Sequence, residues 1–143
     1  MLKIDGIYVN YGNFEALHGI SLKVEEGKIV ALVGGNGAGK TTTINSVSGL
    51  TTLRGGDILF DGKSIKDAPA HERVKMGIIQ VPEGRKLFPY MSVYENLMMG
   101  SYLPGNRARR KENLDMCFDI FPKMAERKDQ TVSYTHLTLP TIR

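Results

Sequence analysis

The chain has 143 residues, of which 41% are hydrophobic and 24% are charged, with 16 glycines. This length is typical of one domain, and the composition excludes a collagen-like, mucin-like or disordered chain, because enough apolar surface is present to offset the entropy of ordering. The net charge of +4 is too small to indicate a class of partner by itself.

The cysteine count and the lengths of the apolar runs exclude several classes of protein. Cys117 is the only cysteine, which excludes a disulfide framework and a four-cysteine zinc site and is typical of a reducing cytosol. The longest apolar run, residues 29–33, is far shorter than the roughly 20 residues that a membrane-spanning helix needs. No long apolar core follows Lys3, so the first residues do not have the pattern of a signal peptide.

The first quarter of the chain predicts three strands. Ile4, Ile7 and Val9 indicate one strand, and the alternation of apolar and polar residues over 20–24 indicates a second that is half buried. After a turn at 25–27, the apolar run over 28–33 is typical of a strand that is buried on both faces of a sheet.

The rest of the chain predicts short helices and strands. A tight turn at Asp61 and Gly62 ends one strand, and a capping box at Ser92 and Glu95 begins one helix. Cys117 lies on the apolar face of the last helix, where we expect it to be a buried small hydrophobe. The expected elements are helix 40–49, strand 57–60, helix 69–76, strand 78–81, helix 92–99 and helix 107–118.

A glycine-rich loop before the helix at 40–49 has the strongest chemical signal in the chain. It matches the pattern G-x-x-x-x-G-K-[ST] with the residues Gly34, Gly35, Asn36, Gly37, Ala38, Gly39, Lys40 and Thr41. Glycines allow the backbone to curl so that successive N–H groups point at phosphate oxygens. Lys40 brings a positive charge to the outer phosphates, and the Thr41 hydroxyl is placed to ligate Mg²⁺.

The alternative is an ordinary glycine-rich turn that happens to end in lysine and threonine. We favour the phosphate loop, because the motif has an apolar strand before it and a helix after it. The N-terminus of that helix adds its positive dipole end to the same anion.

The residues around this loop resemble the ATP-binding subunits of ABC transporters. The resemblance covers residues 26–42, 48–50, 55–62 and 92–100. Tyr11 lies 23 positions before Gly34, where the family has an aromatic residue that stacks on adenine. Stacking on a base is worth about 1–3 kcal/mol. The alternative for Tyr11 is a surface aromatic in a turn, and the phosphate loop nearby favours stacking.

The family also has a loop glutamine that contacts Mg²⁺ and the attacking water. Gln80 is one candidate, but the family's residue stands four positions before a Leu-Phe-Pro-like triplet, which here begins at Leu87. This count selects Glu83 and leaves Gln80 as an ordinary sheet residue. The stretch 81–86 is similar to the ATPases of branched-chain amino acid importers, which tolerate glutamate at this position, and a carboxylate can ligate a hard cation.

The resemblance implies an α/β fold, namely the N-terminal part of an ABC-type P-loop ATPase domain with an antiparallel β subdomain and a partial RecA-like core. It implies ATP and Mg²⁺ as cofactors, with Lys40 and Glu83 as catalytic residues. Thr41 and Glu83 would face the metal, and Tyr11 and the loop through Thr42 would bind the nucleotide.

The resemblance also implies partners and a location. These are a second ATP-binding subunit, identical or different, and transmembrane permease subunits, with the chain peripheral on the cytoplasmic side of the cell membrane. We therefore expect the parent protein to be an ATPase that drives solute uptake, most specifically of branched-chain amino acids.

Three later motifs of the family are not found after Gln130: a Ser-Gly-Gly signature, an Asp-Glu pair that supplies the general base, and a switch histidine. Residues 132–141 instead resemble the translation of a sequencing adapter. We expect 1–130 to be a partial ATP-binding domain that hydrolyses no ATP alone, and 131–143 to be a non-native tail that frays or packs weakly. A natural divergent terminus is the alternative.

Two other classes of function stay open. One is an ABC-type ATPase that serves a soluble process, and the other is a non-catalytic nucleotide-binding half-domain. Nucleic acid is not an expected partner, because the basic cluster at 107–111 is followed by Glu112 and Asp115 and has no aromatic residues between its arginines. Such a cluster is typical of a solvated helix face.

Overall fold

The computed structural model describes residues 1–84, 86–103, 105 and 108–135. Two compact units divide the chain, Met1–Val81 and Pro82–Arg143. Arg107, at the expected start of the last helix, and residues 136–143 of the expected tail lie outside the described residues.

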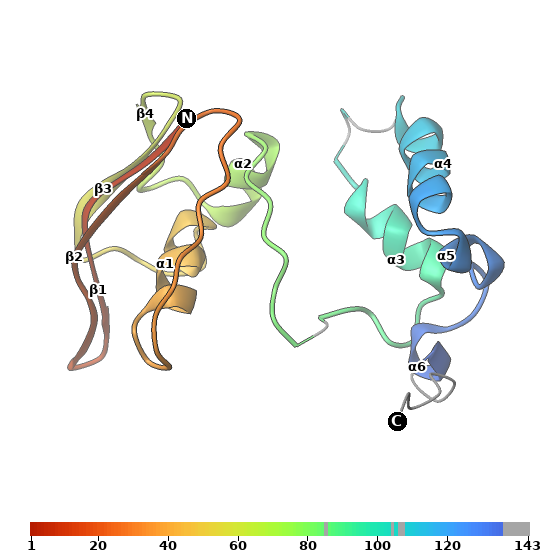
Figure 1. Ribbon diagram of the computed structural model, residues 1–143, viewed down its shortest axis with the longest axis horizontal. Coiled ribbons are helices and arrows are strands. Elements are labelled where there is room, and N and C mark those ends of the chain that lie inside the picture. Colours follow the sequence, from red (N-terminus) through yellow and green to blue (C-terminus); the bar gives the residue numbers. More distant parts are fainter. Residues whose placement is uncertain (85, 104, 106–107, 136–143) are drawn as a thin grey trace. The chain divides into compact units, whose positions relative to one another are not determined.

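The first unit is built on a four-stranded antiparallel sheet in the order β2-β1-β3-β4 (Figure 1). Its strands are β1 (Leu2–Tyr11), β2 (Phe14–Val24), β3 (Gly55–Phe60) and β4 (Lys63–Ser64). The expected strands at 4–9, 20–24 and 57–60 are confirmed. Asp61 and Gly62 form the expected turn, both with positive φ, at 48° and 78°.

An irregularity in β1 places Ile4 and Ile7 in the same core. Residues three apart in a regular strand point to opposite faces of the sheet, but the pairing of β1 with β2 shifts register between these two. Gly6 lies at the shift with φ 54°, and its N–H donates to the Ser21 hydroxyl at 2.8 Å. Each isoleucine contributes about 1.5–3 kcal/mol by burial. The other members of this core are Val9, Leu17, Leu53, Ile58 and Ile65.

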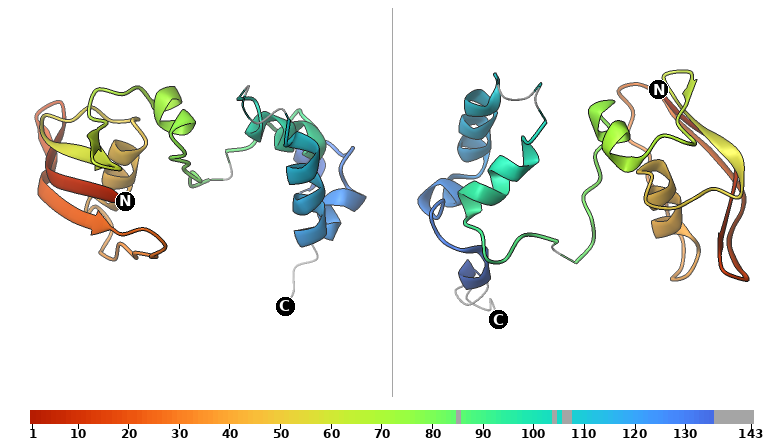
Figure 2. Two further views of the ribbon diagram at one scale, coloured as in Figure 1. Left: turned by 90° about the horizontal axis from the view of Figure 1, so that it is seen from above. Right: turned by 180° about the vertical axis from the view of Figure 1, so that it is seen from behind.

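Two helices complete the first unit, α1 (Lys40–Val47) and α2 (Ala70–Lys75), and they confirm the expected helices at 40–49 and 69–76. Figures 1 and 2 show α1 along one face of the sheet. Arg73 of α2 is 2% exposed and joins the two helices. Its guanidinium donates to the backbone oxygens of Ser46 and Val47, at 2.6 and 2.9 Å, and of Lys66 and Ala68, at 2.9 and 2.8 Å. Arg73 thus supplies donors to carbonyls at the C-terminal end of α1, where the Ser46 oxygen accepts in addition only the Gly49 N–H at 3.3 Å.

The expected strands at 28–33 and 78–81 are wrong, because neither segment is paired in the sheet (orange and green in Figure 1). A buried strand needs neighbours for its N–H and C=O groups, and among the described residues no strand pairs with either segment. Ile29, Val33 and Val81 are accordingly 100%, 89% and 91% exposed. An apolar run indicates that a segment is suited to a buried strand, but it does not show whether other strands are present to pair with it.

The second unit is helical. Its helices are α3 (Val93–Gly100), α4 (Arg110–Ile120), α5 (Pro122–Glu126) and α6 (Val132–Thr135). The expected helix at 92–99 is confirmed, and the last expected helix begins later, at Arg110. Cys117 is partly exposed, so its expected burial is wrong. Met116 and Ile120 of α4 are also more than half exposed, because the other described residues pack against only one side of this helix.

One side chain holds the loop that precedes α3. The Asn96 side-chain oxygen accepts the N–H of Phe88 at 2.9 Å. Its amide nitrogen donates to the backbone oxygens of Phe88, Met91 and Ser92 at 3.1, 3.4 and 2.9 Å. The loop nevertheless exposes its apolar side chains, and Tyr90 is 92% exposed.

The described part of the expected tail is tied to this loop. Val132 N–H donates to the Met91 oxygen and Ser133 N–H to the Pro89 oxygen, both at 3.0 Å, and Val132 is 6% exposed. Of the two expected alternatives, that the tail frays or packs weakly, the first is therefore wrong for residues 131–133. These bonds join main-chain groups, so an unusual composition does not prevent them.

We expect acid to weaken the start of α3. Ser92 N–H donates to Glu95 Oε2 at 2.7 Å, and Glu95 N–H donates to the Ser92 hydroxyl at 3.1 Å, which confirms the expected capping box. The Ser92 backbone N–H, and next its hydroxyl, lower the pKa of Glu95 from its ordinary 4.5. A lowered pKa means stabilisation that is present above the ordinary value and is lost as pH falls through the lowered one.

Amide protection of residues 94–96, followed by NMR during an acid titration, measures this effect. Protection is expected to fall below pH 4.5 in the wild type, and Glu95→Gln is expected to remove that step because the amide does not titrate. The same step in both proteins would show that another group is responsible.

Candidate functional site

The glycine-rich loop at 34–39 leads directly into α1 and is exposed. Gly37 and Gly39 have φ of 81° and 83°, a conformation that other residues rarely adopt. A side chain at Gly39 would also collide with the sheet, because a Cβ there would lie 2.6 Å from Leu17 Cδ2. Glycine is therefore required where the loop passes β2 and enters α1.

Backbone donors gather at the start of α1. Thr43 N–H bonds back to the Gly39 oxygen at 2.8 Å, whereas the N–H groups of Gly39, Lys40, Thr41 and Thr42 donate to no acceptor in the part of the chain that the structure describes. Free N–H groups and the positive end of a helix dipole favour an anion at this point. The loop and α1 therefore provide an anion site.

Lys40 adds a full positive charge to this site. Its ammonium donates to the Gly34 and Gly35 oxygens at 2.7 and 2.6 Å, which holds it over the loop. Thr41 is exposed, and its hydroxyl is available as an oxygen ligand for a hard cation. The described residues contain no cluster of three or more His, Cys, Asp or Glu side chains that could hold a metal by themselves.

Tyr11 lies at the end of β1, near the Thr51 hydroxyl. Its hydroxyl lies 3.5 Å from Thr51 Oγ1, and its ring is at the end of β1 with the residue 52% exposed. The Thr51 hydroxyl, and next the Thr42 hydroxyl, lower the pKa of Tyr11. Because Thr42 follows the phosphate loop directly, an exposed aromatic face lies close to the anion site.

Gln80 belongs to the first unit and Glu83 to the second. Glu83 is exposed, and because it belongs to the other unit its expected place beside Thr41 stays a prediction. Gln80 is not in a strand, and the expectation that it is an ordinary sheet residue is wrong. Its side-chain nitrogen donates to Asn45 Oδ1 on α1 at 3.0 Å, which attaches segment 78–81 to the phosphate-loop helix.

Sequence reasoning missed two residues that support the site, Asn45 and Arg73. Both hold α1 from outside the motif, and both contacts join segments more than 25 residues apart in the chain. No local pattern marks such contacts. The one available signal was that the carbonyls at the end of a helix need donors.

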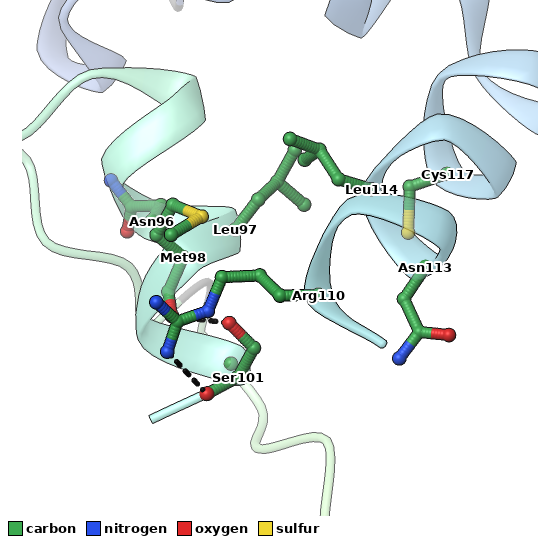
Figure 3. A pocket seen from close by; sticks show the side chains of 9 residues that line it. Asn96, Leu97, Met98, Ser101, Arg110, Asn113, Leu114 and Cys117 are labelled. Atoms are coloured by element: carbon green, nitrogen blue, oxygen red, sulfur yellow. Dashed lines mark hydrogen bonds between the residues drawn. The ribbon is translucent and has the colours of Figure 1, made fainter. Parts of the chain in front are cut away.

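A hollow of about 330 Å³ lies in the second unit between α3 and α4 (Figure 3). Arg110 reaches across it and donates to the Ser101 oxygen at 3.0 Å, while its Nε is buried without a partner among the described residues. None of the residues expected to bind nucleotide lines this hollow. The candidate site is therefore the loop, α1 and Tyr11 in the first unit.

A phosphate loop with an adjacent aromatic face defines a nucleotide-binding protein of the P-loop class. Residues 17–139 match the family model described as ABC transporter, so the chain belongs to the ABC transporter family. Among the described residues, no helix is long and apolar enough to cross a membrane.

Two curated relatives and one solved structure illustrate the similarity. The high-affinity branched-chain amino acid transport ATP-binding protein BraG of Pseudomonas aeruginosa is 35% identical over 130 residues, which are 91% of this chain and 55% of that protein. The alpha-glucoside transport ATP-binding protein AglK of Rhizobium meliloti is 37% identical over 99 residues, 69% of this chain and 26% of that protein.

The solved structure is a nucleotide-free ATP-binding cassette from an ABC transporter. It has a TM-score of 0.76 and 27% identity, and the match covers 93% of this chain and 58% of that one. The expected fold class is confirmed: an antiparallel β subdomain with helices, covering the N-terminal part of the domain. The chain spans about half the length of the curated relative BraG.

Proposed function

We propose that this chain is part of the ATP-binding subunit of an ABC importer, which hydrolyses ATP to drive the uptake of a solute. The observation that carries the proposal is the set of free N–H groups at the start of α1 together with Lys40, which is held over the loop by two carbonyls. This positive cradle fits the phosphates of ATP.

Each expected residue has a role in this proposal. Adenine stacks on Tyr11, and the loop through Thr42 holds the phosphates, with Lys40 on the outermost ones. Thr41 and Glu83 are the oxygen ligands for Mg²⁺, which fits because both are exposed and a hard cation prefers oxygen. When bound, Mg²⁺ supplies charge stabilisation on the phosphates.

We also propose that residues 1–130 are the first part of a larger domain and that 131–143 are a non-native tail. Two observations support the larger domain: the chain matches 55% of BraG, and the apolar segments 28–33 and 78–81 pair with no strand among the described residues. The tail rests on the composition of residues 132–141 alone, since the family match runs to residue 139. Alone, such a chain binds nucleotide weakly and hydrolyses none, because the general base is not in it. Sequencing the gene beyond codon 130 tests this, and a genuine stop codon after Arg143 would contradict it.

The partners in this proposal are a second ATP-binding subunit and transmembrane permease subunits, with the chain peripheral on the cytoplasmic face of the membrane. The exposed loop with Leu87, Phe88 and Tyr90, which are 54%, 51% and 92% exposed, supports contact with a membrane subunit. Branched-chain amino acids are the proposed solute, supported by the name of BraG and by the similarity at 81–86.

Tyr11→Ala is expected to weaken MgATP binding about 5- to 150-fold, the range that corresponds to one base stacked on an aromatic ring. Tyr11→Phe keeps the ring and is expected to retain most of the affinity. Isothermal titration with MgATP measures both.

Titration with magnesium tripolyphosphate provides the control, because this ligand has no base to stack. Its affinity is expected to be the same in the wild type and in Tyr11→Ala. Equal losses with both ligands would mean that the substitution disturbs the loop and that the stacking role is wrong.

A further inference from the structure

The phosphate loop contains one pair of neighbouring residues that favours a chemical rearrangement. Asn36 is followed by Gly37, and it is the only asparagine of the chain that is followed by glycine. The backbone nitrogen of the next residue can attack the side-chain amide of an asparagine, and asparagine is accordingly one of the thermolabile residues. A glycine in the next position has no Cβ to hinder this attack.

The structure leaves the attacking nitrogen accessible. Asn36 and Gly37 are the central residues of a turn that is closed by the Ala38 N–H, which donates to the Gly35 oxygen at 3.3 Å. Gly37 has φ 81°, as a type II turn requires at this position. Its own N–H donates to no acceptor among the described residues. Both central residues are exposed, and a Cβ at Gly37 would meet no atom within 4 Å, so the backbone here has room to rotate.

The charge around the loop favours the same reaction. Loss of the Gly37 amide proton and attack on the side chain both develop negative charge. The Lys40 ammonium donates at 2.6 Å to the Gly35 oxygen, which belongs to the peptide bond just before Asn36. The N-terminus of α1 adds its positive dipole end. Groups that are placed to bind an anion therefore also stabilise an anionic intermediate at this point.

We propose that Asn36 is a site of spontaneous deamidation and that this modification weakens nucleotide binding by the loop. The Gly37 amide gives its proton to hydroxide, and its nitrogen forms a bond to Asn36 Cγ. The Cγ–Nδ2 bond breaks, and the side-chain nitrogen takes a proton from water and leaves as ammonia, which regenerates the hydroxide. Water then opens the cyclic succinimide at either of its carbonyls and leaves aspartate or isoaspartate at position 36.

The effect on binding rests on the proposed function. A carboxylate then replaces a neutral amide in a loop whose N–H groups face phosphates, and like charges repel. Isoaspartate also adds a main-chain atom to the turn and so displaces the N–H groups that follow Asn36. Bound MgATP has the opposite effect, because it occupies the N–H groups of the loop and holds the turn. Nucleotide is therefore expected to slow the modification.

Peptide mapping by mass spectrometry follows the reaction in the whole chain. In mildly alkaline buffer, the peptide that contains Asn36 is expected to convert to two separable products, both with the mass of the aspartate form. Asn13 is the matched control within the chain, since it is also exposed in a turn but is followed by Phe14, whose side chain hinders the attack. It is expected to convert much more slowly. Asn36→Gln is expected to abolish the mass change, because glutamine must close a larger ring.

Isothermal titration with MgATP measures the effect of the modification on binding. The modified chain, separated from the unmodified one and shown by circular dichroism to be folded, is expected to bind about tenfold more weakly or worse. MgATP or magnesium tripolyphosphate, present during the incubation, is expected to slow the conversion of Asn36 and to leave that of Asn13 unchanged.

The outcomes separate this proposal from the proposed function. Conversion of Asn36 no faster than that of Asn13 would overturn the modification site. Equal affinity of the modified and unmodified chains for MgATP would overturn its effect on the loop. A chain that binds no nucleotide before modification would overturn the proposed function and with it the effect on binding, while the conversion of Asn36 would still be seen in the mass.

Discussion

Lys40→Ala is expected to weaken MgATP binding by the chain about 10- to 150-fold. A hydrogen bond from a charged donor is worth about 1.5–3 kcal/mol, and each 1.4 kcal/mol is tenfold in affinity. The Lys40 ammonium already lies over the loop through its bonds to the Gly34 and Gly35 oxygens, so binding requires little rearrangement of this side chain. Isothermal titration measures the loss.

Lys63→Ala is the matched control, because it removes the same charge from an exposed position on β4. Its affinity for MgATP is expected to stay close to that of the wild type. If both variants lost affinity equally, net charge rather than a contact at the loop would explain the result. In that case the assignment of Lys40 to the phosphates would be wrong.

Arg73→Met is expected to lower the free energy of unfolding of the first unit by about 3–5 kcal/mol. The substitution removes one donor each from the carbonyls of Ser46, Val47, Lys66 and Ala68, of which the Ser46 oxygen keeps the Gly49 N–H. An unsatisfied buried acceptor costs about 1–3 kcal/mol. The total is less than four such costs, because the Ser46 oxygen keeps one donor and water reaches some of the other oxygens once the side chain is shortened. Urea unfolding measures the change.

One further variant shows whether the stability depends on the four bonds or on the charge of Arg73, and a second is the control. Arg73→Lys keeps a charge but not the planar fork of donors, so an intermediate loss is expected. Lys75→Ala, on the same helix, breaks only an exposed pair with Glu72 at 2.7 Å and is expected to cost within about 1 kcal/mol. Arg73→Met with no greater loss than Lys75→Ala would show that α1 does not depend on Arg73.

The burial of Arg73 does not remove its charge. Desolvation lowers the pKa of the guanidinium, and Asp67 opposes this change. Arginine nevertheless stays protonated in proteins, so all its donors remain available for the carbonyls. Stability from these bonds is therefore expected to be independent of pH near neutrality.

The parts of the fold that depend on local chemistry could be predicted from the sequence. The turn at Asp61 and Gly62, the capping box at Ser92 and the start of α1 at Lys40 each need particular residues within a few positions. The strands expected at 28–33 and 78–81 failed for the opposite reason, because a strand exists only when other segments pair with it. The apolar sequence of a segment is the same whether or not other strands pair with it.

The candidate site divides in the same way. The glycine loop and Lys40 form one continuous motif, so the sequence predicts them together. The stacking role of Tyr11, whose hydroxyl lies 3.5 Å from Thr51 Oγ1, stays a prediction. The bonds from Arg73 and Gln80 to α1 could not be predicted, since each joins distant segments through a single side chain. Glu83 stays a prediction, because it lies in the other unit.

The four hydrogen bonds of Asn96 have a consequence for motion. They connect the first turn of α3 to both ends of the loop from Phe88 to Ser92. A loop held in this way cannot change shape one residue at a time without breaking several bonds together. We expect the loop and the start of α3 to move together as one rigid body. A displacement of Tyr90 would therefore move the start of the helix as well.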